Sequence, residues 1–186
     1  MSFWQSLTLT LNKRVLASAA AAATAGAVFT ALAAQIAVPL PWTPVPITFQ
    51  VFAVLVCASA LGPRLAAASM VEYLVLGAAG LPVFAGMRGG IGTLLGPTGG
   101  YLVAFAPAAA VAGWLCRRGG LARTILGCAA GVVIIHAVGV AWLRIYLGQT
   151  WTAAFLAGSL PFLIPDALKV LAAVAVIETG RRKGFV

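Results

Sequence analysis

The stretch Pro161-Phe-Leu-Ile-Pro-Asp-Ala-Leu-Lys169 lies inside an apolar run, Trp151 to Ile177, that carries no other charged residue. A run of this length can cross a bilayer as a helix. Residues three apart share one face of a helix, so the Asp166 carboxylate and the Lys169 ammonium should lie side by side. Each charge costs a few kcal/mol to bring into hydrocarbon. The sequence therefore predicts a structural ion pair, half of a binding site for a small polar molecule, or both.

Composition places the rest of the chain in a membrane as well. Of 186 residues, 62% are hydrophobic and only 8% are charged, whereas soluble domains carry about 25% charged residues. We expect one all-α integral membrane domain over residues 1–186. The net charge of +9 does not indicate nucleic-acid binding, because the basic residues form small clusters between apolar runs.

Basic residues also predict the number of crossings. With six spans and both termini in the cytoplasm, nine basic residues lie inside, and only Arg88 and Arg144 lie outside. This bias agrees with the positive-inside rule, whereas five or seven spans would separate the two terminal clusters. The expected spans are approximately 15–38, 47–61, 65–79, 101–116, 124–143 and 154–177.

Three connecting segments have unusual compositions. Residues 39–46 hold four prolines, which predicts an extended, rigid connector. Gly62-Pro63-Arg64 predicts a tight turn. Residues 80–100 hold eight glycines and cannot form a regular lipid-facing helix, so we expect an outer loop or a protein-buried re-entrant segment.

Several polar residues should meet at the outer end of this arrangement. Gln50, Arg88 and Tyr101 lie near that face, and Asp166 lies about a dozen residues into the last span. The sequence thus predicts an outward-opening pocket with hydrogen-bond donors and acceptors. The single histidine, His136, is expected to be hydrogen-bonded to a neighbouring helix rather than to relay protons.

Small residues recur every fourth position in the first span. Ala17, Ala21 and Ala25 form one strip, and a second strip holds Ser18, Ala22, Gly26 and Thr30. Such strips let another helix approach closely. They predict either packing within the chain or docking to a separate membrane subunit.

Motifs for catalysis are absent from the sequence. It has no phosphate-binding Gly-x-x-x-x-Gly-Lys-Ser/Thr loop, no nucleophile elbow and no paired carboxylates. Its three cysteines, Cys57, Cys116 and Cys128, lie in apolar segments without metal-ligand spacing and are expected to be core residues. We expect no catalytic residues and no metal site.

Four stretches of the sequence resemble the BioY family, the biotin-specific substrate-binding (S) components of energy-coupling factor (ECF) transporters. They are Pro44–Gln50, Tyr73–Ala85, Gly96–Tyr101 and Phe162–Lys169, and the Asp-x-x-Lys in the last stretch is the family's hallmark. Their order and spacing extend over residues 14 to 178.

The resemblance implies a six-helix S-component fold in a prokaryotic cell (inner) membrane, with biotin captured near the extracellular side and carried inward. It implies three protein partners, namely a transmembrane coupling protein and two cytoplasmic ABC-type ATPases. It also implies that Ala17, Ala21 and Ala25 dock on the coupling protein. No cofactor is expected besides the transported biotin.

Biotin's chemistry suggests a role for each candidate residue. Asp166 can accept a hydrogen bond from a ureido N–H, while Lys169 donates to the ureido carbonyl. Arg88 is the candidate for the valeryl carboxylate. Gln50 and Tyr101 are expected to add hydrogen bonds. The rings of Tyr73 and Phe84, together with Phe49 and Trp142, are expected to pack on the ligand. The Glu72 carboxylate is expected to touch the ligand or to pair with Lys169 or Arg88. The alternatives are an S component for another vitamin and a structural membrane subunit without transport activity.

Overall fold

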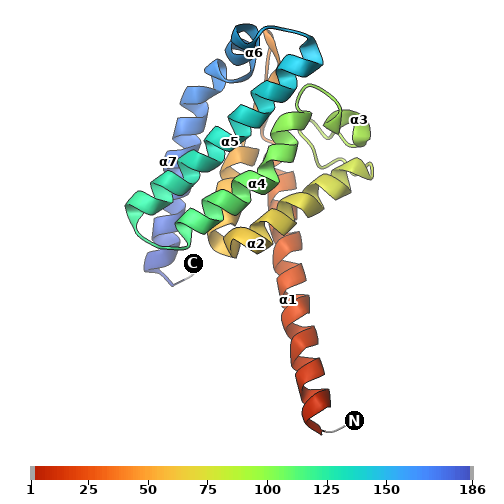
Figure 1. Cartoon of the computed structure of the whole chain (residues 1–186), viewed down its shortest axis with the longest axis vertical. Helices are drawn as coiled ribbons and strands as arrows, with labels where there is room; N and C mark the ends of the chain where they lie inside the picture. The colour runs from red at the N-terminus through yellow and green to blue at the C-terminus, as the bar shows by residue number, and fades with distance from the viewer. Residues whose placement is uncertain (1–2, 185–186) are drawn as a thin grey trace.

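The chain forms a helical bundle with a small β-hairpin at one end (Figure 1). The computed structural model describes residues 3–184, with α1 described at side-chain level from Leu16 onward. The elements in order are α1 (Phe3–Ala34), β1 (Ala37–Leu40), β2 (Thr43–Thr48), α2 (Gln50–Ala78), α3 (Ile91–Leu94), α4 (Gly99–Cys116), α5 (Leu121–Leu147), α6 (Trp151–Gly158), the 3-10 turn η1 (Leu160–Phe162) and α7 (Leu163–Arg182).

Five helical segments within residues 3–184 are long and apolar enough to cross a membrane. They are Leu16–Ala34, Gln50–Ala78, Gly99–Cys116, Leu121–Leu147 and Trp151–Arg182. The chain is therefore a mostly helical, multi-pass membrane protein.

The second of these segments, α2, bends sharply at Gly62. Its φ of 74° and ψ of 174° are not helical, and this positive φ suits glycine. Pro63 then begins the second arm, where its missing N–H leaves no helical hydrogen bond unmade. The two arms diverge from the bend (Figure 1) and correspond to the expected spans 47–61 and 65–79. The expected turn is thus present as a bend within one helical segment.

The α4 helix packs closely against this bend through Gly113. A Cβ at Gly113 would lie 2.6 Å from the Ala58 carbonyl oxygen, a separation that real structures do not show. The absence of a side chain at Gly113 therefore lets α4 lie against both arms of α2.

The all-α prediction is wrong where the prolines cluster. Residues 37–48 form an antiparallel hairpin in which Ala37 pairs with Thr48 and Val38 with Ile47. The ladder is irregular at Pro39, which has no N–H to donate. Consequently, α1 ends at Ala34 rather than at residue 38, and α2 begins at Gln50 rather than at residue 47.

The last apolar segment is likewise not one uninterrupted helix. It is divided into α6, η1 and α7, because Pro161 in η1 cannot donate to a helical hydrogen bond. Asp166 consequently lies in the first turn of α7, and it is still at the middle of the apolar segment Trp151–Arg182, as expected. The partial positive charge of a helix N-terminus favours a carboxylate at this place.

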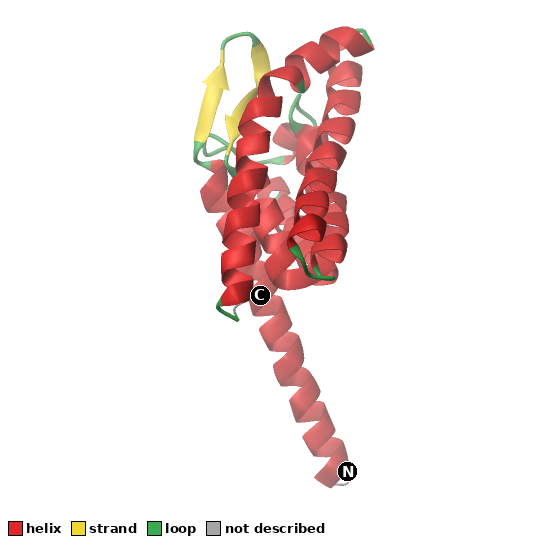
Figure 2. Ribbon diagram, turned by 90° about the vertical axis from the view of Figure 1, so that its left-hand side faces the viewer, coloured by secondary structure: helices red, strands yellow, loops and turns green. Residues whose placement is uncertain are grey.

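The two small-residue strips of α1 have different surroundings. Gly26 and Thr30 are buried against α2, and a Cβ at Gly26 would lie 2.5 Å from Ser69 Oγ. In contrast, Ala17, Ala21 and Ala25 are all exposed. The N-terminal part of α1 projects beyond the bundle, at the end opposite the hairpin (Figure 2). The Gly26–Thr30 half of the second strip packs within the chain, and the alanine strip remains open.

A polar cluster joins three helices at the end of the bundle away from the hairpin. Arg181 Nη1 on α7 donates to Glu178 Oε1 and to Thr124 Oγ1 of α5, both at 2.6 Å. Its Nη2 donates to the Cys116 carbonyl oxygen of α4 at 2.5 Å. Cys57, Cys116 and Cys128 are buried and free, as expected of core residues.

Replacing Arg181 should loosen this end of the bundle. The variant Arg181→Ala removes three hydrogen bonds and leaves the Glu178 carboxylate without its cation, so we expect a loss of about 1–3 kcal/mol of stability. Thermal unfolding of the purified protein in detergent measures the change. The matched control is Arg182→Ala, because Arg182 is exposed; equal stability of the two variants would contradict the prediction.

Candidate functional site

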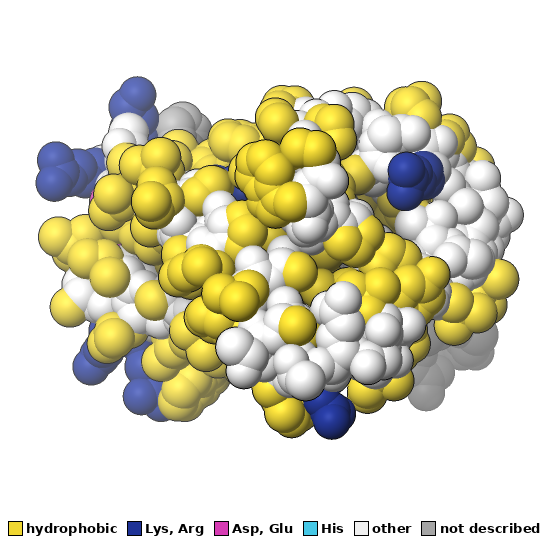
Figure 3. Space-filling view, turned by 90° about the horizontal axis from the view of Figure 1, so that it is seen from above, with side chains coloured by type: hydrophobic (Ala, Val, Ile, Leu, Met, Phe, Trp, Pro, Cys, Tyr) yellow, Lys and Arg dark blue, Asp and Glu magenta, His cyan; other side chains and the backbone are white. Residues whose placement is uncertain are grey.

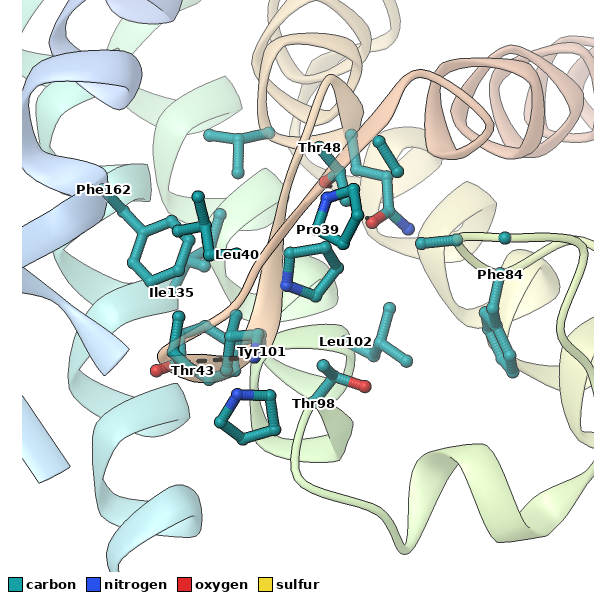
Figure 4. Close-up of a pocket in the computed structure, with 18 of the residues that line it drawn as sticks. Pro39, Leu40, Thr43, Thr48, Phe84, Thr98, Tyr101, Leu102, Ile135 and Phe162 are labelled. Atoms are coloured by element: carbon teal, nitrogen blue, oxygen red, sulfur yellow. Dashed lines mark hydrogen bonds between the residues drawn. The ribbon is translucent and has the colours of Figure 1, made fainter. Parts of the chain in front are cut away.

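A pocket of about 370 Å³ lies beneath the hairpin, within the roughly 300–1,000 Å³ typical of ligand pockets. Its wall combines the hairpin, the glycine-rich loop of residues 80–98, the N-terminal turns of α2, α4 and α7, and the middle of α5. In Figure 4 the hairpin crosses the pocket, with Phe162 and Ile135 on one side and Phe84 on the other. Elements far apart in the sequence therefore share one cavity.

The ion pair expected from the sequence lines this pocket. Lys169 Nζ lies 2.5 Å from Asp166 Oδ1, and the two residues are only 7% and 4% exposed. The spacing of three residues on α7 places both groups on one helix face, as expected. The pair is therefore part of the cavity wall rather than a contact between lipid-facing surfaces.

His136 contributes a third group to this pair from α5. Its Nε2 lies 2.8 Å from Asp166 Oδ2, so both carboxylate oxygens have partners. On the other side of the ring, Nδ1 lies 3.1 Å from Ser159 Oγ. The hydrogen bonds thus run continuously through Ser159, His136, Asp166 and Lys169. The expectation that His136 bonds a neighbouring helix is confirmed.

Gln50 lines the pocket at the start of α2 and is 4% exposed. Its Nε2 donates to the Tyr73 hydroxyl oxygen at 2.6 Å, and its Oε1 accepts from Thr48 Oγ1 at 2.9 Å. The Tyr73 hydroxyl donates in turn to the Val83 carbonyl oxygen at 3.1 Å. Tyr73 stands behind Gln50 and does not line the pocket itself.

Tyr101 also lines the pocket, from the first turns of α4. Its hydroxyl donates to the Gly158 carbonyl oxygen at 2.7 Å. The ring can therefore face a ligand while the hydroxyl ties α4 to the end of α6.

The glycine-rich loop contributes Phe84 and Arg88, which face each other across a tight turn. The Phe84 and Arg88 backbones form two hydrogen bonds, of 2.9 and 3.3 Å. Phe84 is buried, whereas Arg88 is exposed at the rim of the pocket. Viewed from this end, the molecular surface is largely hydrophobic and uncharged, with isolated basic side chains (Figure 3).

Gln35, at the end of α1, holds this turn from behind. Its Nε2 donates to the Phe84 carbonyl oxygen at 3.2 Å, and its Oε1 accepts from the Met87 N–H at 3.0 Å. Met87 has a positive φ of 58°, which a non-glycine residue rarely adopts. The Gln35 side chain therefore stabilises the backbone conformation that presents Phe84 and Arg88.

Some residues proposed from the sequence lie away from the pocket. Glu72 accepts a hydrogen bond from Thr24 Oγ1 of α1 at 2.7 Å, so its expected pairing with Lys169 or Arg88 is wrong. Trp142 Nε1 donates to the Gly96 carbonyl oxygen at 2.8 Å. Both residues join elements of the bundle and do not line the cavity.

Other pocket residues were missed in the sequence. The hairpin contributes Pro39, Leu40 and Thr43, whose segment was expected only to connect two spans, and Thr48, which was expected at the start of the second span. His136 was noticed as a lone polar group, but nothing in its neighbours along the chain indicated Asp166, which is 30 residues away.

Comparison with known proteins gives the family. A model of the BioY family matches residues 7–184. The chain belongs to the BioY family. It is 43% identical over 149 residues to the probable biotin transporter BioY of Pyrococcus horikoshii, a match covering 80% of this chain and 87% of that protein. It is 40% identical over 153 residues to the biotin transporter BioY of Thermotoga maritima, covering 80% and 89%.

A solved structure shares the fold of this BioY-family chain. The crystal structure of the S-component for biotin from an ECF-type ABC transporter superposes with a TM-score of 0.83. The match covers 92% of this chain and 93% of that one, at 23% sequence identity. The likeness establishes an S-component fold for this chain.

The Gln35 contacts lead to a prediction about the rim of the pocket. Gln35→Ala removes the side-chain partners of the Phe84 carbonyl and the Met87 N–H, so the turn at 84–88 should open more often. Hydrogen exchange of the purified protein should show faster exchange there, by roughly tenfold for the loss of one hydrogen bond. The control variant is Gln149→Ala, in an exposed loop; unchanged exchange at 84–88 in Gln35→Ala would refute this role.

Proposed function

We propose that this chain captures biotin in the pocket beneath the hairpin and serves as the S component of an ECF transporter. Its relatives are named as biotin transporters, and the solved structure that shares its fold is an S-component for biotin. The observation that carries the proposal is the buried Asp166–Lys169 pair in the pocket wall, also bonded by His136.

The ureido ring of biotin matches this pair chemically. The ring offers two N–H donors and one carbonyl acceptor. Asp166 accepts from a ureido N–H, and Lys169 donates to the ureido oxygen while neutralising the carboxylate. Hydrogen bonds to charged groups contribute about 1.5–3 kcal/mol each, and exclusion of water by the hairpin strengthens them.

The other end of biotin carries an ionised carboxylate. Arg88 lies exposed at the rim of the same cavity, so its guanidinium can pair with that carboxylate where water remains accessible. Between these two ends, the buried rings of Phe84, Tyr101 and Phe162 line the pocket and pack on the bicyclic ring and alkyl chain.

A catalytic function is less well supported by the same site. Ser159, His136 and Asp166 are the residue types of a hydrolase triad, and their hydrogen bonds are continuous. However, Ser159 is 3% exposed and is not part of the pocket wall, so its hydroxyl cannot reach a bound substrate. We therefore assign Asp166 and His136 to binding, with Ser159 hydrogen-bonded to His136 from behind the pocket wall. A different vitamin and a purely structural role remain outcomes of the binding test below.

We further propose six membrane crossings, with each arm of α2 counted as one, and both termini in the cytoplasm. The described chain begins and ends at the same end of the bundle (Figure 1), as an even number of crossings requires. The bend of α2 and the α4–α5 connection lie there too. Arg88, in the glycine-rich loop, and Arg144, in the last turn of α5, belong to the other end, in agreement with the positive-inside rule.

The exposed alanine strip of α1 is the proposed docking face for a transmembrane coupling protein, which would connect this chain to two cytoplasmic ABC-type ATPases. Ala17, Ala21 and Ala25 are exposed, while Gly26 and Thr30 of the adjacent strip already pack on α2. A smooth alanine face allows close helix approach within a bilayer.

The binding proposal predicts a specific loss at Asp166. Asp166→Asn keeps the shape but removes the charge that holds Lys169 and the ureido N–H, so biotin affinity should fall by roughly tenfold or more. Equilibrium binding of labelled biotin to the purified chain in detergent measures this. The control is Glu72→Gln, because Glu72 is a carboxylate in the membrane-spanning α2 that does not line the pocket; this variant should bind biotin normally. If the unmodified chain does not bind biotin, the proposal is wrong. If Asp166→Asn binds biotin with unchanged affinity, the Asp166–Lys169 pair has only a structural role.

The docking proposal predicts a loss of assembly without a loss of binding. Ala21→Trp places a large side chain on the smooth strip, so copurification with the coupling protein and ATP-dependent uptake should fall strongly while biotin affinity is kept. Val133→Trp, on an exposed position of α5, is the matched lipid-facing control. Normal assembly of the Ala21→Trp protein would argue against this docking face.

A further inference from the structure

We propose that His136 is a positioning residue of the ligand site, which orients the Asp166 carboxylate toward the ligand and does so in its neutral form. The inference rests on the proposed biotin site and adds a residue and a protonation state to it. It starts from the two hydrogen bonds of the imidazole ring, to Asp166 at 2.8 Å and to Ser159 at 3.1 Å.

The partners of the ring define the tautomer. A carboxylate paired with an ammonium can only accept hydrogen bonds, so His136 Nε2 must carry the hydrogen that bonds Asp166 Oδ2. In a neutral ring Nδ1 is then an acceptor, and the Ser159 hydroxyl donates to it. Every polar atom from Ser159 to Lys169 has a partner in this arrangement.

Protonation of the ring would disturb the arrangement in two ways. Nδ1 would become a donor, and the buried Ser159 O–H would lose the acceptor that it has among residues 3–184. Asp166 and Lys169 together carry no net charge, so an imidazolium would leave one uncompensated positive charge in a mostly buried cluster. It would also bond Asp166 more strongly and compete with a ureido N–H for the carboxylate.

Few other charged or titratable groups face His136. From α7 these are Asp166 and Lys169. From the glycine-rich loop Arg88 lines the same pocket, and from α4 Tyr101 does so with its hydroxyl bonded to the Gly158 carbonyl. The contributions of the hairpin, α2 and η1 to the pocket are uncharged. No second carboxylate of the described residues lines the pocket to compensate an imidazolium.

The consequence is a dependence of ligand binding on pH. Histidine is the side chain that normally changes charge between pH 5 and 8. Because the neutral ring is the binding-competent form, biotin affinity should fall by roughly threefold or more at acidic pH, where a ring that gains a proton no longer accepts from Ser159. A biotin amide should show the same trend, since its side chain does not ionise and contributes no proton of its own.

Two substitutions separate positioning from simple packing. His136→Gln keeps an amide N–H that can reach Asp166 but cannot become charged, so it should bind within a few-fold of the original affinity and lose the pH dependence. His136→Leu fills the space without a donor, and its affinity should fall by roughly tenfold at neutral pH. Wild-type affinity in His136→Leu, or an unchanged pH profile in His136→Gln, overturns the inference.

The single histidine of the chain allows a second measurement that needs no ligand. With ¹⁵N-labelled histidine and a histidine-free affinity tag, the two ring-nitrogen shifts report the tautomer directly. We expect the Nε2–H form at neutral pH, and a change of tautomer or charge state in Asp166→Asn. A charged or Nδ1–H ring in the unmodified protein overturns the inference even if biotin binds. If biotin fails to bind at every pH, the proposed function falls, while the spectrum still decides whether His136 orients Asp166.

Discussion

The ionised carboxylate of Asp166, buried in a membrane bundle, is the constraint on which the site depends. An isolated charge in such a place is very costly, so partners must be built around it. Lys169 supplies the opposite charge from the next turn of α7, His136 supplies a hydrogen bond from α5, and the N-terminus of α7 supplies a favourable dipole. These three partners come from separate parts of the fold, so the fold must form before the carboxylate is stabilised.

The breaks in helical structure make this possible. Because α6 ends before η1, α7 begins inside the bundle and brings Asp166 to a helix N-terminus. Because the proline-rich segment forms a hairpin rather than a helix, it crosses the cavity and limits access of water. Gln35 and Tyr73 then connect the glycine-rich loop to α1 and α2. Regular helices surround the site, and irregular backbone lines it, as expected of backbone shielded from lipid.

Sequence reasoning succeeded where the signal is local. The three-residue spacing of Asp166 and Lys169 predicted their contact, and Gly62-Pro63 predicted the bend of α2. It failed where a contact joins residues that are not neighbours on one helix. The hairpin requires Ala37 to pair with Thr48, and the His136–Asp166 hydrogen bond joins residues 30 positions apart. Glu72 illustrates the same limit, since a membrane carboxylate suggested a ligand or an ion pair, and the partner is the neutral Thr24 hydroxyl of α1. Periodicity identifies helix faces, but it does not say which faces meet.

The hairpin also indicates how deep the chain sits in the bilayer. A two-stranded sheet has two outer edges whose backbone carbonyls lack ladder partners, and hydrocarbon offers them no hydrogen bonds. Residues 37–48 must therefore lie in water or among lipid headgroups, and the hydrocarbon boundary must fall below them. Asp166 and His136 lie deeper than the hairpin, because His136 is near the middle of α5 and Asp166 is at the middle of the apolar segment Trp151–Arg182. The cavity therefore extends from the hairpin to the middle of a helix long enough to cross the membrane, so the groups that line its deep end are shielded by protein rather than by water.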